Sequence, residues 1–216
     1  MEKIKVLLAE DHIIVRQGLR SILEKHPGIE VIAEAGDGRE AVSAAEKLNP
    51  DVILMDFSMP GLNGLEATRQ IKQRVPRTKI LILTRHANRA YLESLIKVGA
   101  TGYILKKSAA DELIFAIESV YQGDTYLDPA ISKQVTVNDL RGIKKESWGQ
   151  RLTSRQSEVL QLIAEGHPNR KIADILKISV KTVENHRTNL MQILDLNSTA
   201  ELIQYSIRQG IISLDD

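Results

Sequence analysis

The chain has 216 residues, of which 43% are hydrophobic and 26% charged, with a formal net charge of +1 and no cysteine. This composition is that of a globular protein of one large or two small domains, and the lack of cysteine excludes disulfides, thiolate metal sites and cysteine nucleophiles. No apolar run approaches the ~18 residues of a membrane span, and the N-terminus shows no cleavage signal, so we expect a cytoplasmic protein with no membrane contact.

Charge is balanced along the chain as well as in total. Residues 1–122 carry 17 Lys/Arg against 16 Asp/Glu, and residues 151–216 carry 8 against 8. Neither part is basic as a whole, so any contact with nucleic acid must come from a local patch.

The first ~120 residues alternate between strand-like and helix-like periods. Five short apolar runs predict strands, and five amphipathic stretches between and after them predict helices. The expected strands are Ile4–Ala9, Glu30–Ala35, Val52–Asp56, Lys79–Thr84 and Gly102–Lys106; the expected helices are His12–His26, Asp37–Leu48, Asn63–Arg74, Ala90–Val98 and Ala109–Tyr121. This order predicts an α/β, flavodoxin-like, doubly wound (βα)5 domain over residues 1–122, with a parallel sheet covered on both faces.

The pattern changes after residue 122. Residues 123–150 are rich in glycine and charge and are predicted to be an interdomain linker, with one short helix from Pro129 to Asp139. Residues 151–216 have only helical periods, opened by capping signals at Thr153, Ser179 and Ser198. We expect a small all-α domain of four helices there.

Several polar residues fall where the predicted parallel strands end. They are Glu10, Asp11, Asp56, Thr84 and Lys106. Because the carboxyl ends of parallel strands meet at one edge of the sheet, these side chains should lie close together. Three crowded carboxylates repel each other unless a cation lies between them, and oxygen ligands suit Mg²⁺.

Each of these residues taken alone is more typical of a turn or a cap than of a site. Together these residues predict a reactive site. A cation beside Asp56 would allow its carboxylate to attack a phosphoryl group, and Lys106 and the Thr84 hydroxyl would bind the added group.

Four segments resemble the receiver domain of two-component response regulators: Glu10-Asp11-His12, residues 54–64 (LMDFSMPGLNG), Leu83-Thr84 and residues 102–106 (GYILK). The resemblance implies that Asp56 is phosphorylated by a partner histidine kinase. It also implies that Asp11, Asp56 and the backbone carbonyl of Ser58 bind Mg²⁺, with Glu10 acting mostly through water.

The same resemblance assigns a switch to three more residues. Thr84 matches the switch hydroxyl, Lys106 the lysine that meets the phosphoryl group, and Tyr103 the aromatic residue whose rotamer follows the hydroxyl. Residues 85–88 (RHAN) depart from the family, where a Met and acidic residues often follow the hydroxyl. This departure bears on the dephosphorylation rate rather than on the assignment.

The helical domain has a short helix, a tight turn and a longer polar-faced helix, which suggests a helix-turn-helix. A solvated surface helix would have the same periodicity. Residues 152–212 nevertheless resemble the LuxR-type helix-turn-helix, and the two domains together resemble the NarL/FixJ subfamily. The resemblance implies contact with double-stranded DNA, with base edges facing Glu184, Asn185 and Thr188 and phosphates held mostly by Lys181, Thr182, His186, Arg187 and Asn189. Relatives often carry Lys where Glu184 stands, so Glu184 should either accept a hydrogen bond from a base or repel a wrong sequence.

The sequence therefore predicts a transcription factor switched by phosphorylation, which dimerises and binds DNA when Asp56 is modified. A dimer contact is expected from Leu202, Ile203 and Ile207, which could equally fill the core of the bundle. Two alternatives remain: an output domain that binds protein instead of DNA, and a Mg²⁺-dependent phosphatase with an aspartate nucleophile. Such phosphatases typically carry a second Asp two residues after the first, where this chain has Ser58, so we expect no enzymatic activity.

Overall fold

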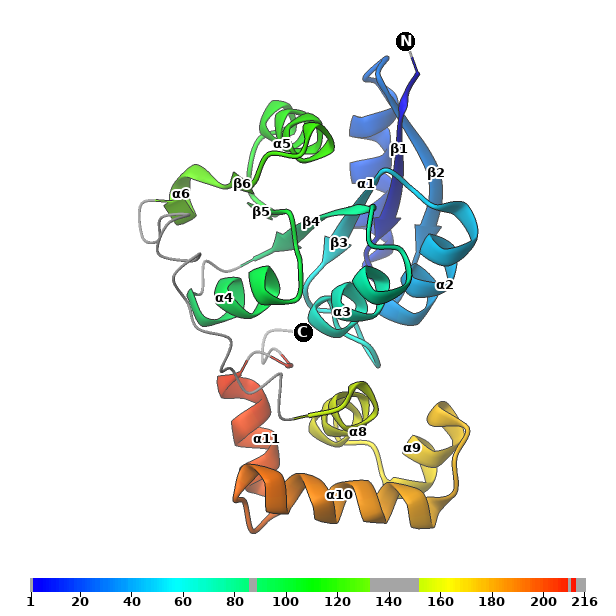
Figure 1. Ribbon diagram of the computed structural model, residues 1–216, viewed down its shortest axis with the longest axis vertical. Helices are drawn as coiled ribbons and strands as arrows, with labels where there is room; N and C mark the ends of the chain where they lie inside the picture. Colours follow the sequence, from blue (N-terminus) through cyan, green and yellow to red (C-terminus); the bar gives the residue numbers. More distant parts are fainter. Residues whose placement is uncertain (1, 86–88, 133–151, 210, 213–216) are drawn as a thin grey trace. The chain divides into compact units, whose positions relative to one another are not determined.

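The computed structural model describes residues 2–85, 89–132, 152–209 and 211–212 (Figure 1). The chain forms two compact units, Met1–Lys144 and Lys145–Asp216, and each is described here by itself.

The first unit is a parallel sheet with helices on both faces. Its strands are β1 (Ile4–Ala9), β2 (Ile29–Ala35), β3 (Val52–Asp56), β4 (Lys79–Thr84), β5 (Gly102–Leu105) and β6 (Tyr126–Leu127). Its helices are α1 (Ile13–Glu24), α2 (Gly38–Leu48), α3 (Gly64–Arg74), α4 (Arg89–Lys97), α5 (Ala110–Gln122) and α6 (Pro129–Ser132). The strand order is β2-β1-β3-β4-β5-β6 and all the pairings are parallel, which confirms the expected doubly wound fold.

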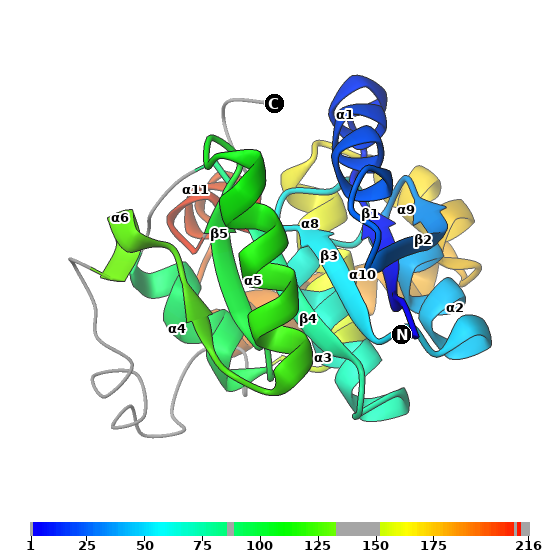
Figure 2. The ribbon, with the colours of Figure 1, turned by 90° about the horizontal axis from the view of Figure 1, so that it is seen from above.

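Burial explains why the central strands are apolar throughout. Every residue of β3 is buried, since one face of the sheet packs under α1 and α5 and the other under α2, α3 and α4 (Figures 1 and 2). The core on the α1 and α5 side is contributed by alternate strand positions, among them Val6, Leu8, Val52, Leu54, Leu81, Leu83 and Ile104. A sheet buried on both faces needs such runs, and the polar residues are left to the strand ends.

Local capping sets where the helices begin. Asp37 and Asn63 cap α2 and α3 by accepting the backbone N–H of the residue three positions on. Between β3 and α3 the chain turns back so tightly that a Cβ on Gly64 would lie 2.3 Å from the Asp56 carbonyl oxygen. Gly64 therefore allows α3 to start directly against the backbone of Asp56.

The segment expected to be a linker contains ordered structure at its beginning. β6 adds a sixth strand beside β5, with Gly102 opposite Tyr126, and α6 follows as a single turn. The predicted short helix from Pro129 is thus observed only as far as Ser132, and its remaining residues lie outside the described part of the chain. Two strand residues are too few to show a period, so β6 could not be predicted from hydrophobic patterning.

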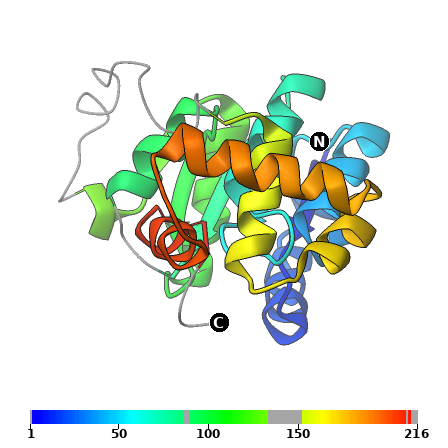
Figure 3. The same ribbon diagram turned by 90° about the horizontal axis from the view of Figure 1, so that it is seen from below.

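The described residues of the second unit form a bundle of four helices (Figure 3). These are α8 (Ser154–Ala164), α9 (Asn169–Leu176), α10 (Val180–Leu194) and α11 (Thr199–Arg208). α10 packs against α8 and α9, and α11 packs against α8. Lys177, with a φ of 53°, forms the left-handed turn between α9 and α10 that a helix-turn-helix requires.

Capping boxes were predicted at Thr153 and Ser198. The Thr153 box is confirmed, because Thr153 and Gln156 each accept the other's backbone N–H. Ser198 accepts the N–H of Glu201 as predicted, but the Glu201 carboxylate accepts the N–H of Asn197. The reciprocal bond of that second box is therefore displaced by one residue.

Among the described residues, none of the helices combines the length and the apolar character that crossing a membrane would require.

Candidate functional site

The parallel sheet brings the predicted acidic residues together at one edge. Glu10 and Asp11 follow β1, Asp56 ends β3 and Lys106 follows β5. Glu10 and Asp56 are almost fully buried, at 0% and 1% exposed, while Asp11 is partly exposed. The two buried carboxylates share one cation: Lys106 Nζ lies 2.8 Å from Glu10 Oε2 and 2.8 Å from Asp56 Oδ2.

One lysine does not balance these carboxylates. Single ligand atoms from Glu10, Asp11, His12 and Asp56 all lie within 4.8 Å of one another. Burial and the Glu10 carboxylate raise the pKa of Asp56 to about 7, against the opposing effect of Lys106. The arrangement is thus short of positive charge, and the donor set of carboxylates fits a hard divalent cation.

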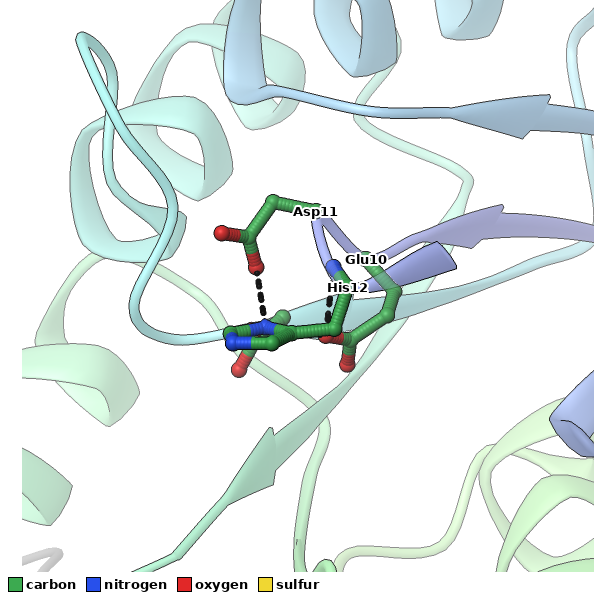
Figure 4. Close-up of side chains that lie close together, drawn as sticks. Glu10, Asp11 and His12 are labelled. Carbon is green, nitrogen blue, oxygen red and sulfur yellow. Dashed lines mark hydrogen bonds and ion pairs between the residues drawn. The ribbon is translucent and has the colours of Figure 1, made fainter. Parts of the chain in front are cut away.

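His12 extends the cluster outward (Figure 4). Its Nδ1 lies 2.9 Å from Asp11 Oδ1 and 3.2 Å from Glu10 Oε1, and its Nε2 lies 3.2 Å from Arg85 Nη2. Because the guanidinium can only donate, Nε2 is the acceptor and Nδ1 carries the hydrogen that faces the carboxylates. This contact between His12 and Arg85 was not predicted, because no sequence pattern relates two residues 73 positions apart.

The loop that carries the acidic residues is held from behind by Arg16. Its Nη1 donates to the Glu10 carbonyl, and its Nε lies 3.1 Å from Glu34 Oε2. Sequence reasoning missed this contact, because Arg16 lies on a helix whose polar face has the usual surface pattern.

Three further residues predicted for this site are Thr84, Tyr103 and Ser58. Thr84 ends β4 and is 4% exposed, and Tyr103 lies within β5 and is 1% exposed. Ser58 is partly buried, and its backbone N–H points to Asp56 Oδ1 at 3.4 Å. Ser58 therefore lies in the loop after Asp56 and Thr84 ends the neighbouring strand, whereas Tyr103 is one strand farther away, on β5.

The second candidate site is the outer face of α10. Lys181, Glu184, Asn185, Thr188 and Asn189 are exposed, whereas Val183 and Leu190 are fully buried in the bundle. The Lys181 ammonium lies 3.5 Å from the Glu184 carboxylate. Within the second unit this face of α10 is polar and exposed.

Three residues named for DNA contact are less exposed. His186 is half-buried, and Thr182 shares a hydrogen bond with Ser179 at the start of the helix, with 2.8 Å between their hydroxyl oxygens. Arg187 is half-buried and donates to Asn169 Oδ1 at 3.4 Å and to the Thr199 hydroxyl. This geometry favours a role for Arg187 in joining α9, α10 and α11 over the phosphate contact expected from the resemblance.

Comparison with known proteins assigns both units to families. Residues 6–118 match the response regulator receiver domain, and residues 150–206 match the bacterial regulatory proteins of the luxR family. The chain belongs to the LuxR-type two-component response regulators. The subfamily resemblance found in the sequence is thereby confirmed.

Individual relatives of this response regulator match over nearly its whole length. It is 39% identical to the transcriptional regulatory protein DegU of Brevibacillus brevis, over 98% of this chain and 96% of DegU. It is 40% identical to the oxygen regulatory protein NreC of Staphylococcus carnosus, over 96% of this chain and 99% of NreC. The solved complex of the response regulator RcsB with DNA is similar with a TM-score of 0.58 and 29% identity, over 94% of this chain and 98% of RcsB.

Proposed function

We propose that this response regulator controls transcription by accepting a phosphoryl group on Asp56 from a partner histidine kinase. The observation that carries the proposal is the buried Asp56 carboxylate at the carboxyl edge of the sheet, 2.8 Å from Lys106 and crowded by Glu10 and Asp11. An ionised carboxylate oxygen attacks phosphorus while the bond from phosphorus to the kinase imidazole nitrogen breaks, and the departing nitrogen takes a proton from water.

The residues proposed to hold Mg²⁺ are Asp11, Asp56 and the Ser58 carbonyl, with Glu10 acting through water. Bound there, Mg²⁺ supplies the positive charge that lets one anion approach another. Lys106 then pairs with the new phosphoryl oxygens, and Thr84 donates its hydroxyl to them. Tyr103 is proposed to follow the movement of Thr84 and so alter the surface around β4 and β5.

The output is proposed to be binding of double-stranded DNA by α10. Support comes from the exposed polar face of α10, from the left-handed turn at Lys177 and from the similarity to RcsB, which has been solved with DNA. Asn185 and Thr188 would meet base edges with Glu184, while Lys181 and Asn189 would meet phosphates. Thr182 and His186 complete the phosphate contacts at the rim of this face.

Phosphorylation is proposed to promote a homodimer. RcsB has been solved as dimers on DNA. Leu202 is fully buried in the core of the second unit, so its part in the expected dimer contact is not supported. Ile203 and Ile207 are partly exposed and remain candidates.

The domain limits of 1–122, 123–150 and 151–216 also remain a proposal. The receiver match supports the first limit approximately, whereas β6 and α6 continue the first unit into the segment proposed as linker. Because promoter DNA is in the cytoplasm, that location is part of the proposal as well.

Two measurements test this function. With acetyl phosphate and Mg²⁺, the intact mass of the chain should rise by one phosphoryl group, and Asp56→Asn should abolish the adduct. Selection of duplexes from a random pool, with and without the phosphodonor, should then recover a common sequence far more efficiently from the phosphorylated protein. An adduct that persists in Asp56→Asn would refute the proposed acceptor.

The same assay separates this function from that of an enzyme. A long-lived single adduct is expected, because Ser58 stands where a phosphatase would carry its second aspartate. Rapid multiple turnover of acetyl phosphate would instead favour the phosphatase. DNA binding that did not weaken as salt rises would favour an output that binds protein.

A further inference from the structure

Asp128 is a buried carboxylate in the first unit, near the end of its described residues. It is 3% exposed and lies between β6 and α6. A carboxylate removed from water is stable only when hydrogen bonds or charges satisfy its oxygens. The partners of Asp128 therefore show what this residue holds together.

Three donors meet this carboxylate. Oδ2 accepts the backbone N–H of Leu105 at 3.1 Å and the Ser108 hydroxyl at 2.5 Å, and Oδ1 accepts the N–H of Ala130 at 2.9 Å. The Asp128 backbone also donates to the Tyr103 carbonyl at 2.9 Å. One side chain thus joins the loop between β5 and α5 to the start of α6.

The loop held in this way carries Lys106. Leu105 and Ser108 flank Lys106 and Lys107, so the same carboxylate oxygen fastens both ends of this short loop. Lys106 in turn spans Glu10 and Asp56. A displacement of the Lys106 backbone towards or away from Asp56 would therefore strain the two hydrogen bonds that hold its neighbours to Asp128.

On its other side, Asp128 belongs to a segment that is tied to the sheet and continues towards the second unit. Tyr126 pairs with Gly102 in β5 and makes an edge contact with the Phe115 ring, with 6.1 Å between ring centroids. A Cβ on Gly102 would lie 2.8 Å from side-chain carbons of Leu81 and Val120 and 3.3 Å from the Tyr126 Cβ, so β5 is closely packed where β6 pairs with it. The Lys106 loop and the start of α6 are thus joined through the Asp128 carboxylate.

We propose that Asp128 is a positioning residue that couples phosphorylation of Asp56, through the Lys106 loop, to the chain segment leading to the DNA-binding unit. The coupling rests on the proposed function, because it needs a phosphoryl group that Lys106 contacts. It deepens that function by assigning the step between the modified site and the output.

Three substitutions test these hydrogen bonds. Ser108→Ala removes the hydrogen bond from the Ser108 hydroxyl to Asp128 Oδ2. Asp128→Asn keeps the shape but has a single acceptor oxygen, so it cannot serve Ala130 and the Leu105–Ser108 pair at once. Ser108→Thr keeps the hydroxyl. The matched control is Thr78→Val, which removes a buried hydrogen bond to the Pro50 carbonyl, 2.8 Å long, at the opposite end of β4.

The measurement is the ratio of DNA dissociation constants of unphosphorylated and phosphorylated full-length protein. It uses a duplex selected with the wild type, and each protein is compared at an equal phosphorylated fraction read from its intact mass. We expect the ratio to fall at least fivefold in Ser108→Ala and Asp128→Asn, and to stay within twofold of wild type in Ser108→Thr and Thr78→Val. If Asp128→Asn does not fold, the ratio measured for Ser108→Ala alone tests the coupling.

Different results would overturn the proposed function and the coupling by Asp128. A wild type whose DNA binding ignores phosphorylation would overturn the proposed function and this coupling with it. A responsive wild type whose ratio is matched by Ser108→Ala and by folded Asp128→Asn would overturn the coupling alone. An equal loss in Thr78→Val would also overturn it, because any weakening of the sheet would then suffice.

Discussion

Replacing Asp56 by Asn should make the metal-free protein more stable. Asp56 and Glu10 are two buried carboxylates that share Lys106, and the pKa of Asp56 is raised from 3.8 to about 7 by burial and by Glu10. Ionisation of Asp56 therefore costs more free energy in the folded state than in the unfolded chain. An amide of the same shape removes that charge and leaves Lys106 paired with Glu10.

The size of the gain follows from the pKa difference. A rise of about 3 units, at 1.36 kcal/mol per unit, corresponds to about 4 kcal/mol at neutral pH as an upper value. Because the amide gives up its share of the Lys106 contact, we expect roughly 2–4 kcal/mol, or an increase in melting temperature of roughly 5 °C or more.

The sign of the pH dependence is equally specific. Between about pH 4 and pH 7 the unfolded wild type ionises Asp56 while the folded state holds the proton, so stability from this group is lost as pH rises. The advantage of Asp56→Asn should thus be greatest above pH 7 and less than half as large at pH 5. The matched control is Asp51→Asn at the amino end of β3, where the carboxylate accepts the Lys5 N–H near the surface and the amide oxygen can replace it.

Scanning calorimetry of the full chain in EDTA, repeated with Mg²⁺, provides the assay. Mg²⁺ should stabilise the wild type by mass action and narrow its gap to Asp56→Asn. If Asp56→Asn is no more stable than the wild type at pH 7.5 in EDTA, the carboxylate is not under electrostatic strain. That result would refute the inference that a cation lies beside Asp56.

Other results are expected from single changes elsewhere. Arg187→Ala should destabilise the second unit by about 1–2 kcal/mol, because the guanidinium donates hydrogen bonds to Asn169 and Thr199. Urea denaturation followed by circular dichroism measures this loss. A change of DNA affinity without loss of stability would contradict the expectation. Lys181→Glu should weaken binding on every duplex and lower the slope of log affinity against log salt by about 1, as fluorescence anisotropy can measure; an unchanged slope would remove Lys181 from the interface. Asp11→Asn should weaken Mg²⁺ binding at least tenfold by isothermal titration calorimetry, whereas equal affinity would show that the ion lies elsewhere.

The sequence predicted the fold well because each layer of the receiver leaves a local signature. A strand buried on both faces must be apolar along its length, as Val52–Asp56 is, and a helix between two such strands must cross over. From that topology alone, the meeting of Glu10, Asp11, Asp56 and Lys106 at one edge could be foreseen. The identity of the ion-paired atoms could not, since rotamers decide them.

What the sequence did not reveal depends on side chains that meet across long separations. Asp128 binds Leu105 and Ser108, which precede it by 23 and 20 residues, and no periodicity encodes such a contact. Arg187 matched a DNA-contact position, yet its guanidinium faces Asn169 and Thr199. In both cases burial of a polar group was decisive, and burial is a property of the packed structure.

Under the proposed function, the charge imbalance around Asp56 drives the switch and also lowers the stability of the unphosphorylated protein. Adding a phosphoryl group replaces one carboxylate charge by about −1.5 to −2, which increases the attraction for Lys106. Lys106 sits on a loop whose two ends are bound by one oxygen of Asp128, so this stronger attraction acts on β6 and α6 as well as on the site. An apolar residue at position 56 would give a more stable sheet but would exert no such pull. The buried carboxylate therefore stands at a position where stability alone would favour an uncharged side chain.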